Sequence, residues 1–200
     1  NFAKPGRVPA AISPDEKFLY SVSARDMAVG WASVAQDGAL KYGGSIDVRA
    51  PLKLEIEENK DTYTGFRAGG LSIPADGKNL YLAYAYRRAT LIAVFARDAG
   101  TGELKFRETL ELGKSMKARA IGFRADGLAG FYVTGARKDA GAVGGFTRDP
   151  ATGRLTAGAE FSASKDFPVG HMAVDPSGKV CYVSDNGGHK SGGLHVLRLE

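Results

Sequence analysis

Cysteine is almost absent from this chain of 200 residues, in which Cys181 is the single thiol. One cysteine excludes an intrachain disulfide and a cysteine-rich zinc cluster, so we expect the fold to be stabilised by its core. A lone thiol leaves the compartment open, since cytosolic and periplasmic proteins both tolerate one. Between the two, a periplasmic or secreted location is slightly favoured over the cytoplasm.

Long apolar runs and helical patterns are lacking as well. No segment approaches the ~20 apolar residues that span a bilayer, and none keeps apolar residues at i, i+3 and i+4 over three turns. We therefore expect no membrane span and an all-β chain. The sequence opens with Asn1 and has no charged-then-apolar leader, which predicts a processed or excised N-terminus.

Familiar catalytic and cofactor motifs are also missing. The chain has no Gly-x-Ser-x-Gly elbow, no His-Glu-x-x-His, no Gly-x-x-x-x-Gly-Lys and no dinucleotide-binding glycine pattern between a strand and a helix. Its three histidines, His171, His189 and His195, have no spacing that would bring metal ligands together. We predict neither a cofactor nor a metal.

Turn-forming residues are what the sequence has in abundance, with 27 glycines and 8 prolines. Their spacing reveals a repeat. Equivalent turn positions lie 61, 50 and 51 residues apart, at Glu16, Gly77, Gly127 and Gly178, and a second marker recurs at Gly38, Gly102 and Gly153. A period near fifty residues is typical of a repeat architecture.

Each repeat contains four short strands separated by turns. Asp-Gly and Thr-Gly pairs supply the positive-φ positions of tight hairpins, and apolar and aromatic residues fill the strands between them. Repeated four-stranded antiparallel units build a β-propeller. We predict one β-propeller domain over residues 1–200, with four visible repeats at approximately 7–49, 64–113, 116–164 and 167–200.

Two irregularities leave the ring open to interpretation. Residues 50–63 add an extra hairpin, in which Leu52, Leu54 and Ile56 alternate with charged residues, as in an edge strand or a docking surface. The fourth repeat stops after its third strand. The chain then forms a closed four-bladed ring, an arc of a larger propeller, or a half-ring completed by a second copy.

A tyrosine recurs in the second strand of each repeat. We align four segments, residues 18–20, 80–82, 131–133 and 181–183, and treat their tyrosines as one recurring feature of the second strand: Tyr20, Tyr81, Tyr132 and Tyr182. Since one blade cannot bury both of its faces alone, we expect these rings to pack between neighbouring blades.

The segments "SPDEKFLYSVS", "IAVFARDAGTGELK" and "GFTRDPATGRLTAG" give the chain a family likeness. The sequence resembles the YVTN/lactonase-type propellers, which include 6-phosphogluconolactonase-like and muconate-lactonising proteins. The resemblance implies a propeller that usually has seven blades. It covers nearly the whole chain, but it consists of turn signatures, which specify the blade rather than the chemistry.

Net charge is +5, with a sequence pI near 9.3. Propeller topology would place the loops after each second strand at one mouth of the channel. These loops, together with Arg7 from a connection between blades, carry a predicted cationic rim: Arg7, Arg25, Arg87, Arg88, Arg137, Lys138, His189 and Lys190. The opposite end collects aspartates, diluted by basic residues that include Arg97 and Arg148.

The rim favours a non-catalytic binding or scaffold module. It would present its cationic face to an acidic protein or another anionic partner, or serve as a subunit of a larger assembly. Single-stranded nucleic acid is not expected, because only Tyr84 and Tyr86, beside Arg87, offer stacking platforms. A homo-oligomer or a larger complex that completes the propeller stays open.

An alternative is a lactone hydrolase or isomerase acting on a sugar or carboxylate lactone. His171 is expected at the start of an innermost strand by the channel mouth, where the resemblance implies His and Arg, and Arg67 and Arg119 lie at comparable places. Arginines could hold a carboxylate or phosphate and stabilise an oxyanion, with His171 as general acid or base. Their offsets from the turn markers differ, at ten, eight and seven residues, so strand alternation does not guarantee that all three point inward.

Overall fold

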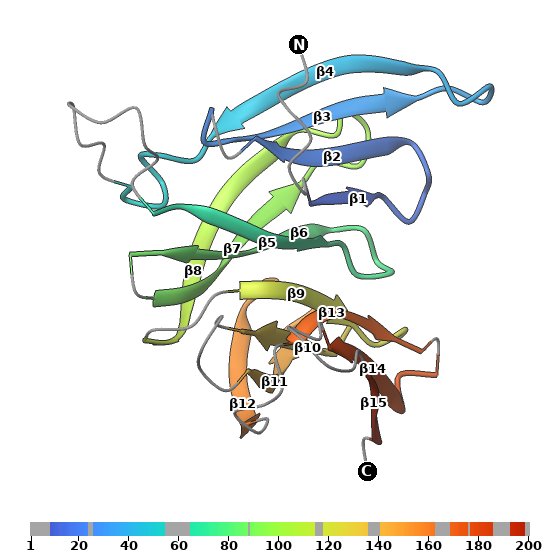
Figure 1. Cartoon of the computed structure of the whole chain (residues 1–200). Coiled ribbons are helices and arrows are strands. Elements are labelled where there is room, and N and C mark those ends of the chain that lie inside the picture. The colour runs from blue at the N-terminus through green and yellow to red at the C-terminus, as the bar shows by residue number, and fades with distance from the viewer. Residues whose placement is uncertain are drawn as a thin grey trace.

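Fifteen strands make up the part of the chain that the computed structural model describes, which covers residues 9–23, 26–54, 65–87, 89–114, 118–135, 141–162, 169–175, 177–185 and 193–198. Within these ranges there is no helix that could cross a membrane. The strands form four antiparallel sheets that follow one another along the molecule (Figure 1). The first sheet lies at one end and the fourth at the other.

The sheets have consecutive strand order and are called blades 1 to 4 here. Blade 1 contains β1 (Ala10–Ile12), β2 (Phe18–Ser23), β3 (Ala28–Val34) and β4 (Leu40–Asp47). Blade 2 contains β5 (Arg67–Ser72), β6 (Asn79–Tyr86), β7 (Ala89–Arg97) and β8 (Leu104–Lys114). Blade 3 contains β9 (Ala118–Phe123), β10 (Ala129–Thr134), β11 (Ala142–Arg148) and β12 (Leu155–Ser162). Blade 4 contains β13 (Val169–Val174), β14 (Val180–Asp185) and β15 (Leu194–Arg198).

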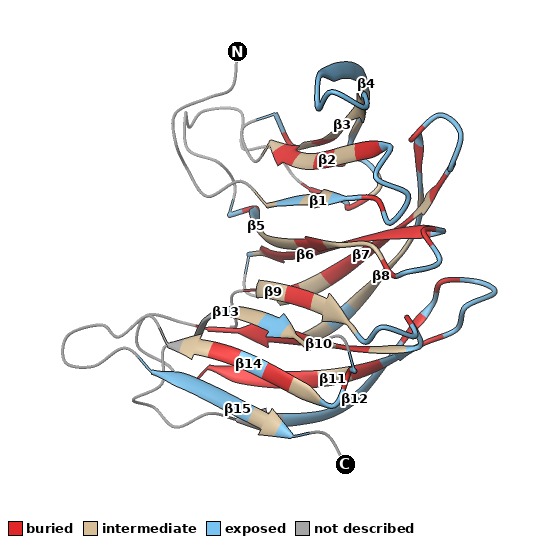
Figure 2. Cartoon of the chain, turned by 90° about the vertical axis from the view of Figure 1, so that its right-hand side faces the viewer, coloured by how far each residue is buried: buried red, intermediate tan, exposed pale blue. Residues whose placement is uncertain are grey.

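The first strand of each blade lies innermost. β9 has β5 on one side and β13 on the other, and β1 contacts β5. This arrangement confirms the predicted all-β propeller of antiparallel blades. Among the three arrangements left open by the sequence, the closed four-bladed ring is wrong, because blades 1 and 4 lie at opposite ends of the row (Figures 1 and 2).

The turns between first and second strands form where the sequence predicted them. In blade 2 the Asp76 carboxylate accepts a 3.1 Å hydrogen bond from the backbone N–H of Lys78, and Gly77 between them has a φ of 66°. This left-handed backbone suits glycine, which has no Cβ to clash. Blade 1 has Glu16 at the same position with a φ of 58°. Because Glu16 has a Cβ, the backbone of this turn is strained.

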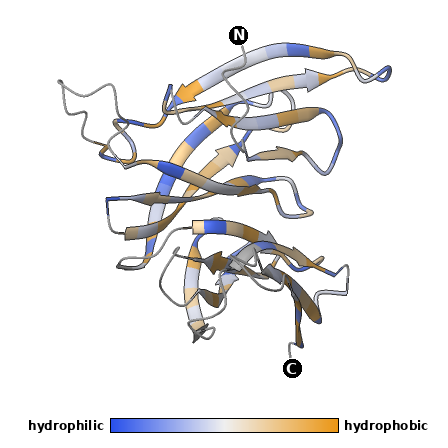
Figure 3. Cartoon of the chain, viewed as in Figure 1, coloured by the Kyte–Doolittle hydropathy of each residue, from blue (hydrophilic) through white to orange (hydrophobic). Residues whose placement is uncertain are grey.

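The cores lie between blades rather than within them. β6 is the clearest case, because its two faces pack on different neighbours (Figure 2). Leu80 and Leu82 belong to the core shared with blade 1, whereas Tyr81 and Ala83 belong to the core shared with blade 3. Polar and apolar residues alternate along part of β8, the outermost strand of blade 2 (Figure 3). Each interior blade is therefore stabilised by the blades on both sides.

A buried arginine joins blade 1 to blade 2. The side chain of Arg97, at the end of β7, is 1% exposed and donates to Tyr20 Oη at 3.0 Å and to both carboxylate oxygens of Asp15 at 3.0 Å. The Tyr20 hydroxyl in turn donates to the carbonyl of Gly102 at 2.9 Å. We call this arrangement the tyrosine–arginine latch.

The latch recurs between blades 2 and 3. Arg148 Nε donates to Tyr81 Oη at 2.7 Å, its guanidinium lies 2.9 Å from the Asp76 carboxylate, and Tyr81 donates to the Gly153 carbonyl at 2.7 Å. The expectation that Arg97 and Arg148 dilute a surface of aspartates is therefore wrong. Both guanidiniums are buried at a boundary between two blades. There an aspartate of the preceding blade compensates the charge, Asp15 for Arg97 and Asp76 for Arg148.

The third boundary has no such latch in the described residues. In each of the first three blades, the backbone N–H at the end of the third strand donates to the carbonyl of the residue just before the second strand, which is Lys17, Lys78 or Leu128. Tyr20 and Tyr81 lie three residues after Lys17 and Lys78, and the residue three positions after Leu128 is Phe131. The alignment that grouped Tyr132 with these tyrosines is thus wrong by one residue. Tyr132 points to the opposite face, packs in the core shared with blade 2 and donates to Glu160 at 2.9 Å.

The strand expected at the start of the extra segment is also wrong. Residues 49–53 form turns, in which Leu52 N–H donates to the Val48 carbonyl at 3.0 Å and Leu54 N–H donates to the Arg49 carbonyl at 2.8 Å. Both leucines are buried in the core between blades 1 and 2. The segment therefore packs into this core as turns closed by its own backbone hydrogen bonds. Residues 55–64 lie outside the described part of the chain.

Candidate functional site

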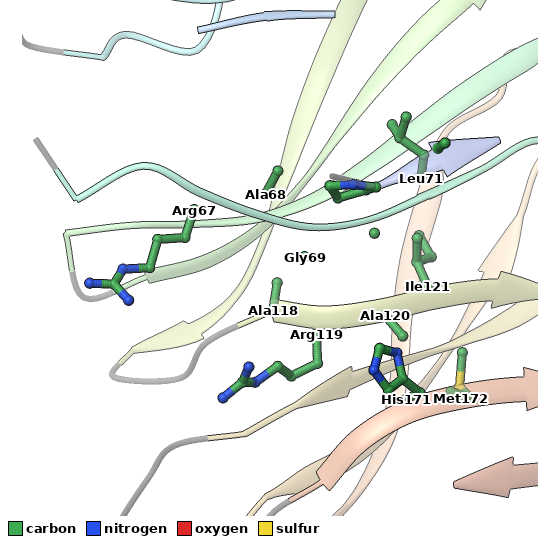
Figure 4. Close-up of a pocket in the computed structure, with 13 residues that line it drawn as sticks. Arg67, Ala68, Gly69, Leu71, Ala118, Arg119, Ala120, Ile121, His171 and Met172 are labelled. Atoms are coloured by element: carbon green, nitrogen blue, oxygen red, sulfur yellow. The ribbon is translucent and has the colours of Figure 1, made fainter. Parts of the chain in front are cut away.

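The inner strands of all four blades surround a cavity of about 720 Å³ at the end where these strands begin. Figure 4 shows the side chains around it. The described lining consists of Pro9, Ala10, Arg67, Ala68, Gly69, Gly70, Leu71, Ala118, Arg119, Ala120, Ile121, His171 and Met172. None of these residues is acidic, so the ionisable groups of the described lining are two guanidiniums and one imidazole.

Three of the inner strands carry a β-bulge at the same place. The pairing of β5 with β6 skips Gly69, that of β9 with β10 skips Arg119, and that of β13 with β14 skips Gly170. Each bulged residue lies eight positions before the turn glycine of its blade. A bulge changes which way the following side chains point. It therefore decides which residues face the cavity.

The bulges show that the three predicted site residues are not equivalent positions. Arg119 is itself a bulged residue, Arg67 lies two residues before the bulge of its strand, and His171 lies one residue after. The distances of these three residues from their turn glycines differ because the residues occupy different places relative to the bulge of their strand. The structure nevertheless brings all three residues to one cavity.

Arg67 and Arg119 point the same way. Figure 4 shows both side chains extending away from Leu71 and Ile121, toward the ends at which β5 and β9 begin. Arg67 is exposed and Arg119 is half-buried. Arg119 Nε is buried and has no hydrogen-bond partner among the described residues. A buried donor without an acceptor costs about 1–3 kcal/mol, which an anion in the cavity would offset.

His171 enters the same cavity from the fourth blade. It is exposed, and its backbone N–H donates to Ser184 Oγ at 3.1 Å. The bulge of β13 lies at Gly170, the residue before His171. This hydrogen bond therefore helps to hold β13 to β14 directly after the bulge. The imidazole can exchange a proton with a molecule in the cavity, which is the chemistry that general acid–base catalysis requires.

Close packing of two backbones shapes the floor of the cavity. A Cβ added to Gly69 would lie 2.3 Å from the carbonyl oxygen of Ala118, on the next inner strand. Only glycine permits this approach. The absence of a Cβ at Gly69 therefore lets β5 and β9 lie against each other at the cavity.

Of the predicted cationic rim, the structure describes Arg87 alone. Arg87 lies in the turn between β6 and β7, with its guanidinium 5.4 Å from the centre of the Tyr86 ring, and it does not line the cavity. The other rim residues lie outside the described part of the chain: Arg7, Arg25, Arg88, Arg137, Lys138, His189 and Lys190. The rim thus stays a prediction.

Two other expectations concern bound groups. Tyr84 cannot serve as a stacking platform for a base, because it is 1% exposed in the core between blades 1 and 2. No group of three or more His, Cys, Asp or Glu side chains within the described ranges could hold a metal ion. The lone Cys181 is fully buried, and burial raises the pKa of its thiol to about 11. A thiol of this kind is unreactive.

Antiparallel blades around a common axis, with a cavity at the mouth of that axis, define a β-propeller with a channel-mouth site. Residues 9–171 match the model of the lactonase, 7-bladed β-propeller family. The chain belongs to this family. No curated protein matches the chain.

Solved structures share the fold at low sequence identity. A Lactobacillus plantarum protein has a TM-score of 0.71 at 16% identity, covering 98% of this chain and 58% of its own. A proposed 6-phosphogluconolactonase from Bacteroides fragilis has a TM-score of 0.70 at 17% identity, covering 96% and 52%. A periplasmic gluconolactonase from Pseudomonas aeruginosa has a TM-score of 0.70 at 20% identity, covering 96% and 50%. The chain thus spans between half and three fifths of the length of these proteins.

Proposed function

We propose that the chain carries the catalytic mouth of a lactone hydrolase that acts on a sugar or carboxylate lactone. The observation that carries this proposal is the convergence of Arg67, Arg119 and His171 on one cavity whose described lining lacks acids. Membership of the lactonase propeller family and the gluconolactonase names of two similar structures support it.

The proposed reaction adds water to the lactone carbonyl. His171 accepts a proton from a water molecule as the water oxygen bonds to the carbonyl carbon. The two guanidiniums stabilise the negative charge that develops on the carbonyl oxygen, or bind a carboxylate or phosphate elsewhere on the substrate. The bond from the carbonyl carbon to the ring oxygen then breaks, and the proton passes to that oxygen. The product is the open hydroxy acid.

Acid release from glucono-δ-lactone, its 6-phosphate and a muconate-type lactone, followed in a pH-stat, tests the proposal. We expect a rate above spontaneous hydrolysis with at least one of the three. His171→Ala should lower kcat by about 10²–10⁴-fold, the usual contribution of a general base. His195→Ala, on β15 and outside the described cavity lining, is the matched control.

Arg119→Ala should raise KM more for the phosphorylated lactone than for the neutral one, because a guanidinium binds an anion by paired hydrogen bonds. Arg107→Ala, an exposed arginine of β8, should leave both values unchanged. Absence of turnover with all three lactones, or a fully active His171→Ala variant, excludes the proposed hydrolase.

The cationic rim supports a separate proposal, in which the same mouth docks an acidic protein or another anionic partner. Arg87 is the described residue that bears on it, and its position at a loop between second and third strands fits the predicted rim.

A further inference from the structure

Two paired positions meet directly after the bulge of the inner strand in blades 2 to 4. One lies on the first strand, seven residues before the turn position of its blade, and the other lies on the second strand, six residues after it. The pairs are Gly70 with Ala83, Ala120 with Val133, and His171 with Ser184. In blade 1 the same spacing gives Pro9 and Val22, and the Val22 N–H donates to the Pro9 carbonyl at 3.3 Å. All four blades can therefore be compared at one place.

Blade 4 differs from the other three blades at both positions. At the second-strand position, blades 1 to 3 have buried apolar residues that are 1%, 1% and 0% exposed: Val22, Ala83 and Val133. At the first-strand position they have residues whose side chains carry no titratable group: Pro9, Gly70 and Ala120. Blade 4 has the half-buried Ser184 and the imidazole of His171. The hydroxyl and the imidazole thus occur together, in the same blade.

The Ser184 hydroxyl contacts both backbone polar groups of His171. Ser184 Oγ accepts the His171 N–H at 3.1 Å and lies 3.5 Å from the His171 carbonyl oxygen, to which it donates. A bulge disrupts the ladder of backbone hydrogen bonds where the extra residue is inserted. Here a side chain supplies the acceptor for the first N–H after the bulge. The backbone that bears the imidazole is therefore held by the Ser184 side chain as well as by strand pairing.

The two chain neighbours of His171 show where this support is needed. Met172, the following residue, packs against β9, since a Cβ added to Gly122 would lie 3.2 Å from the methyl carbon of Met172. Gly170, the preceding residue, has no side chain to pack and is skipped by the pairing with β14. Ser184 thus constrains His171 beside the less packed of its two neighbours.

We propose that Ser184 is a positioning residue, which sets the direction in which the His171 imidazole enters the cavity. The inference rests on the proposed function for its kinetic consequence, because a general base must lie within hydrogen-bond reach of the water that it activates. Ser184 is not part of the described cavity lining, so it acts through His171 rather than on the substrate. Displacing a reacting group by about 1 Å can lower a rate by about 10²-fold.

Nuclear magnetic resonance of the full chain tests the positioning without a substrate. Ser184→Ala should fold, because blade 2 has Ala83 at the same position. The His171 amide then loses its acceptor, so we expect its hydrogen exchange to become about two- to tenfold faster, the value of one hydrogen bond. The imidazole resonances should shift or broaden, because the ring samples more than one orientation. Ser184→Thr keeps the hydroxyl and should restore both observations.

Ser33→Ala is the matched control for both observations. Ser33 is also a half-buried serine of a strand, and its hydroxyl donates to the Lys41 carbonyl at 3.4 Å, but it does not line the described cavity. The variant should leave the His171 signals unchanged. Unchanged exchange and imidazole resonances in Ser184→Ala would overturn the inference, whether or not any lactone is hydrolysed.

Kinetics with a lactone that the chain hydrolyses tests the consequence for the reaction. Ser184→Ala should lower kcat by about 10–10²-fold and change KM by less than about threefold, because Arg67 and Arg119 lie on other strands and still bind the substrate. Ser184→Thr should recover most of kcat. Altered His171 signals with an unchanged kcat would overturn the role of Ser184 in the reaction. Absence of turnover with every lactone excludes the hydrolase, and the resonance data then decide on the positioning alone.

Discussion

Arg148 Nε lies 2.7 Å from the hydroxyl of Tyr81, a residue 67 positions earlier in the chain and in the preceding blade. The same relationship joins Arg97 to Tyr20, at 3.0 Å. In both cases the tyrosine hydroxyl accepts from the guanidinium and donates to a turn glycine. Two boundaries between blades are thus held by a polar latch inside an apolar core.

Removing the hydroxyl of a latch tyrosine should destabilise the fold. We expect Tyr20→Phe and Tyr81→Phe each to lower the free energy of unfolding by about 1–2 kcal/mol, because a buried carbonyl and a guanidinium each lose a partner. Urea unfolding measures this. Tyr42→Phe, on an exposed ring, should change it by less than about 0.5 kcal/mol. Equal effects at all three tyrosines would contradict the latch.

Acid should weaken the first latch. The Ser13 hydroxyl, followed by Arg97, holds the pKa of Asp15 down at about 2. Because the unfolded carboxyl has a pKa near 3.9, the ionised Asp15 stabilises the fold above about pH 4, and this contribution is lost as the pH falls toward 2. Asp15→Asn should therefore be less stable at neutral pH and show a smaller decline between pH 4 and 2. Urea midpoints that run parallel to the wild type over this window would refute the assignment.

The strained turn of blade 1 offers a stabilising change. Glu16→Gly should raise the free energy of unfolding by about 0.5–1 kcal/mol, because glycine adopts the φ of 58° without a Cβ clash. Gly77→Ala, at the equivalent turn of blade 2, should have the opposite effect. Thermal unfolding of the two variants measures the sign, and a destabilised Glu16→Gly variant would show that the glutamate side chain contributes more than the strain costs.

Substitution at the bulge of blade 2 should disturb the cavity. In Gly69→Ala the new Cβ would meet the Ala118 carbonyl oxygen at 2.3 Å, so β5 and β9 must separate, and we expect a loss of about 1–3 kcal/mol. Any lactonase activity should fall with it. Gly30→Ala is the control, since its Cβ would lie 3.7 Å from the nearest atom. Equal stability of the two variants would show that the close packing at Gly69 is not required.

Charge reversal tests docking at the cationic rim. Replacing Arg87, Arg88, Arg137 and Lys138 by Glu should abolish binding of the chain to poly-glutamate at low salt, because the field at the mouth changes sign. Reversing four exposed basic residues outside the rim, Lys17, Lys41, Lys105 and Arg107, changes the net charge by the same amount and serves as the control. Binding that survives the rim variant, or that both variants weaken equally, would count against a localised rim.

The blades themselves could be predicted from the sequence, because their signals are local. The segment FLYSVS forms β2 over its whole length, and the turn positions at Glu16 and Gly77 adopt the expected positive φ. Asp-Gly turns and short apolar strands act within a few residues of each other, so the pattern is legible without knowledge of the fold.

Features that depend on residues far apart could not be predicted in this way. Arg97 looks like a surface charge until Asp15, 82 residues away, is placed beside it. Arg67, Arg119 and His171 could be proposed as neighbours from their places near the starts of the inner strands. Their orientation could not, because a bulge depends on the partner strand. The constant distance of eight residues from each bulge to its turn glycine becomes visible only when the strand pairing is known.

The three bulges have a consequence for how such a mouth can change. Each bulge inserts one extra residue into an inner strand relative to the strand that pairs with it. The bulged residue is therefore left out of the pairing that holds the sheet together. A different side chain at the bulged Arg119 would change which molecules the cavity accepts, whereas Gly69 must stay glycine because of the Ala118 carbonyl. The supporting architecture need not be rebuilt each time, provided that the new group fits between neighbouring backbones.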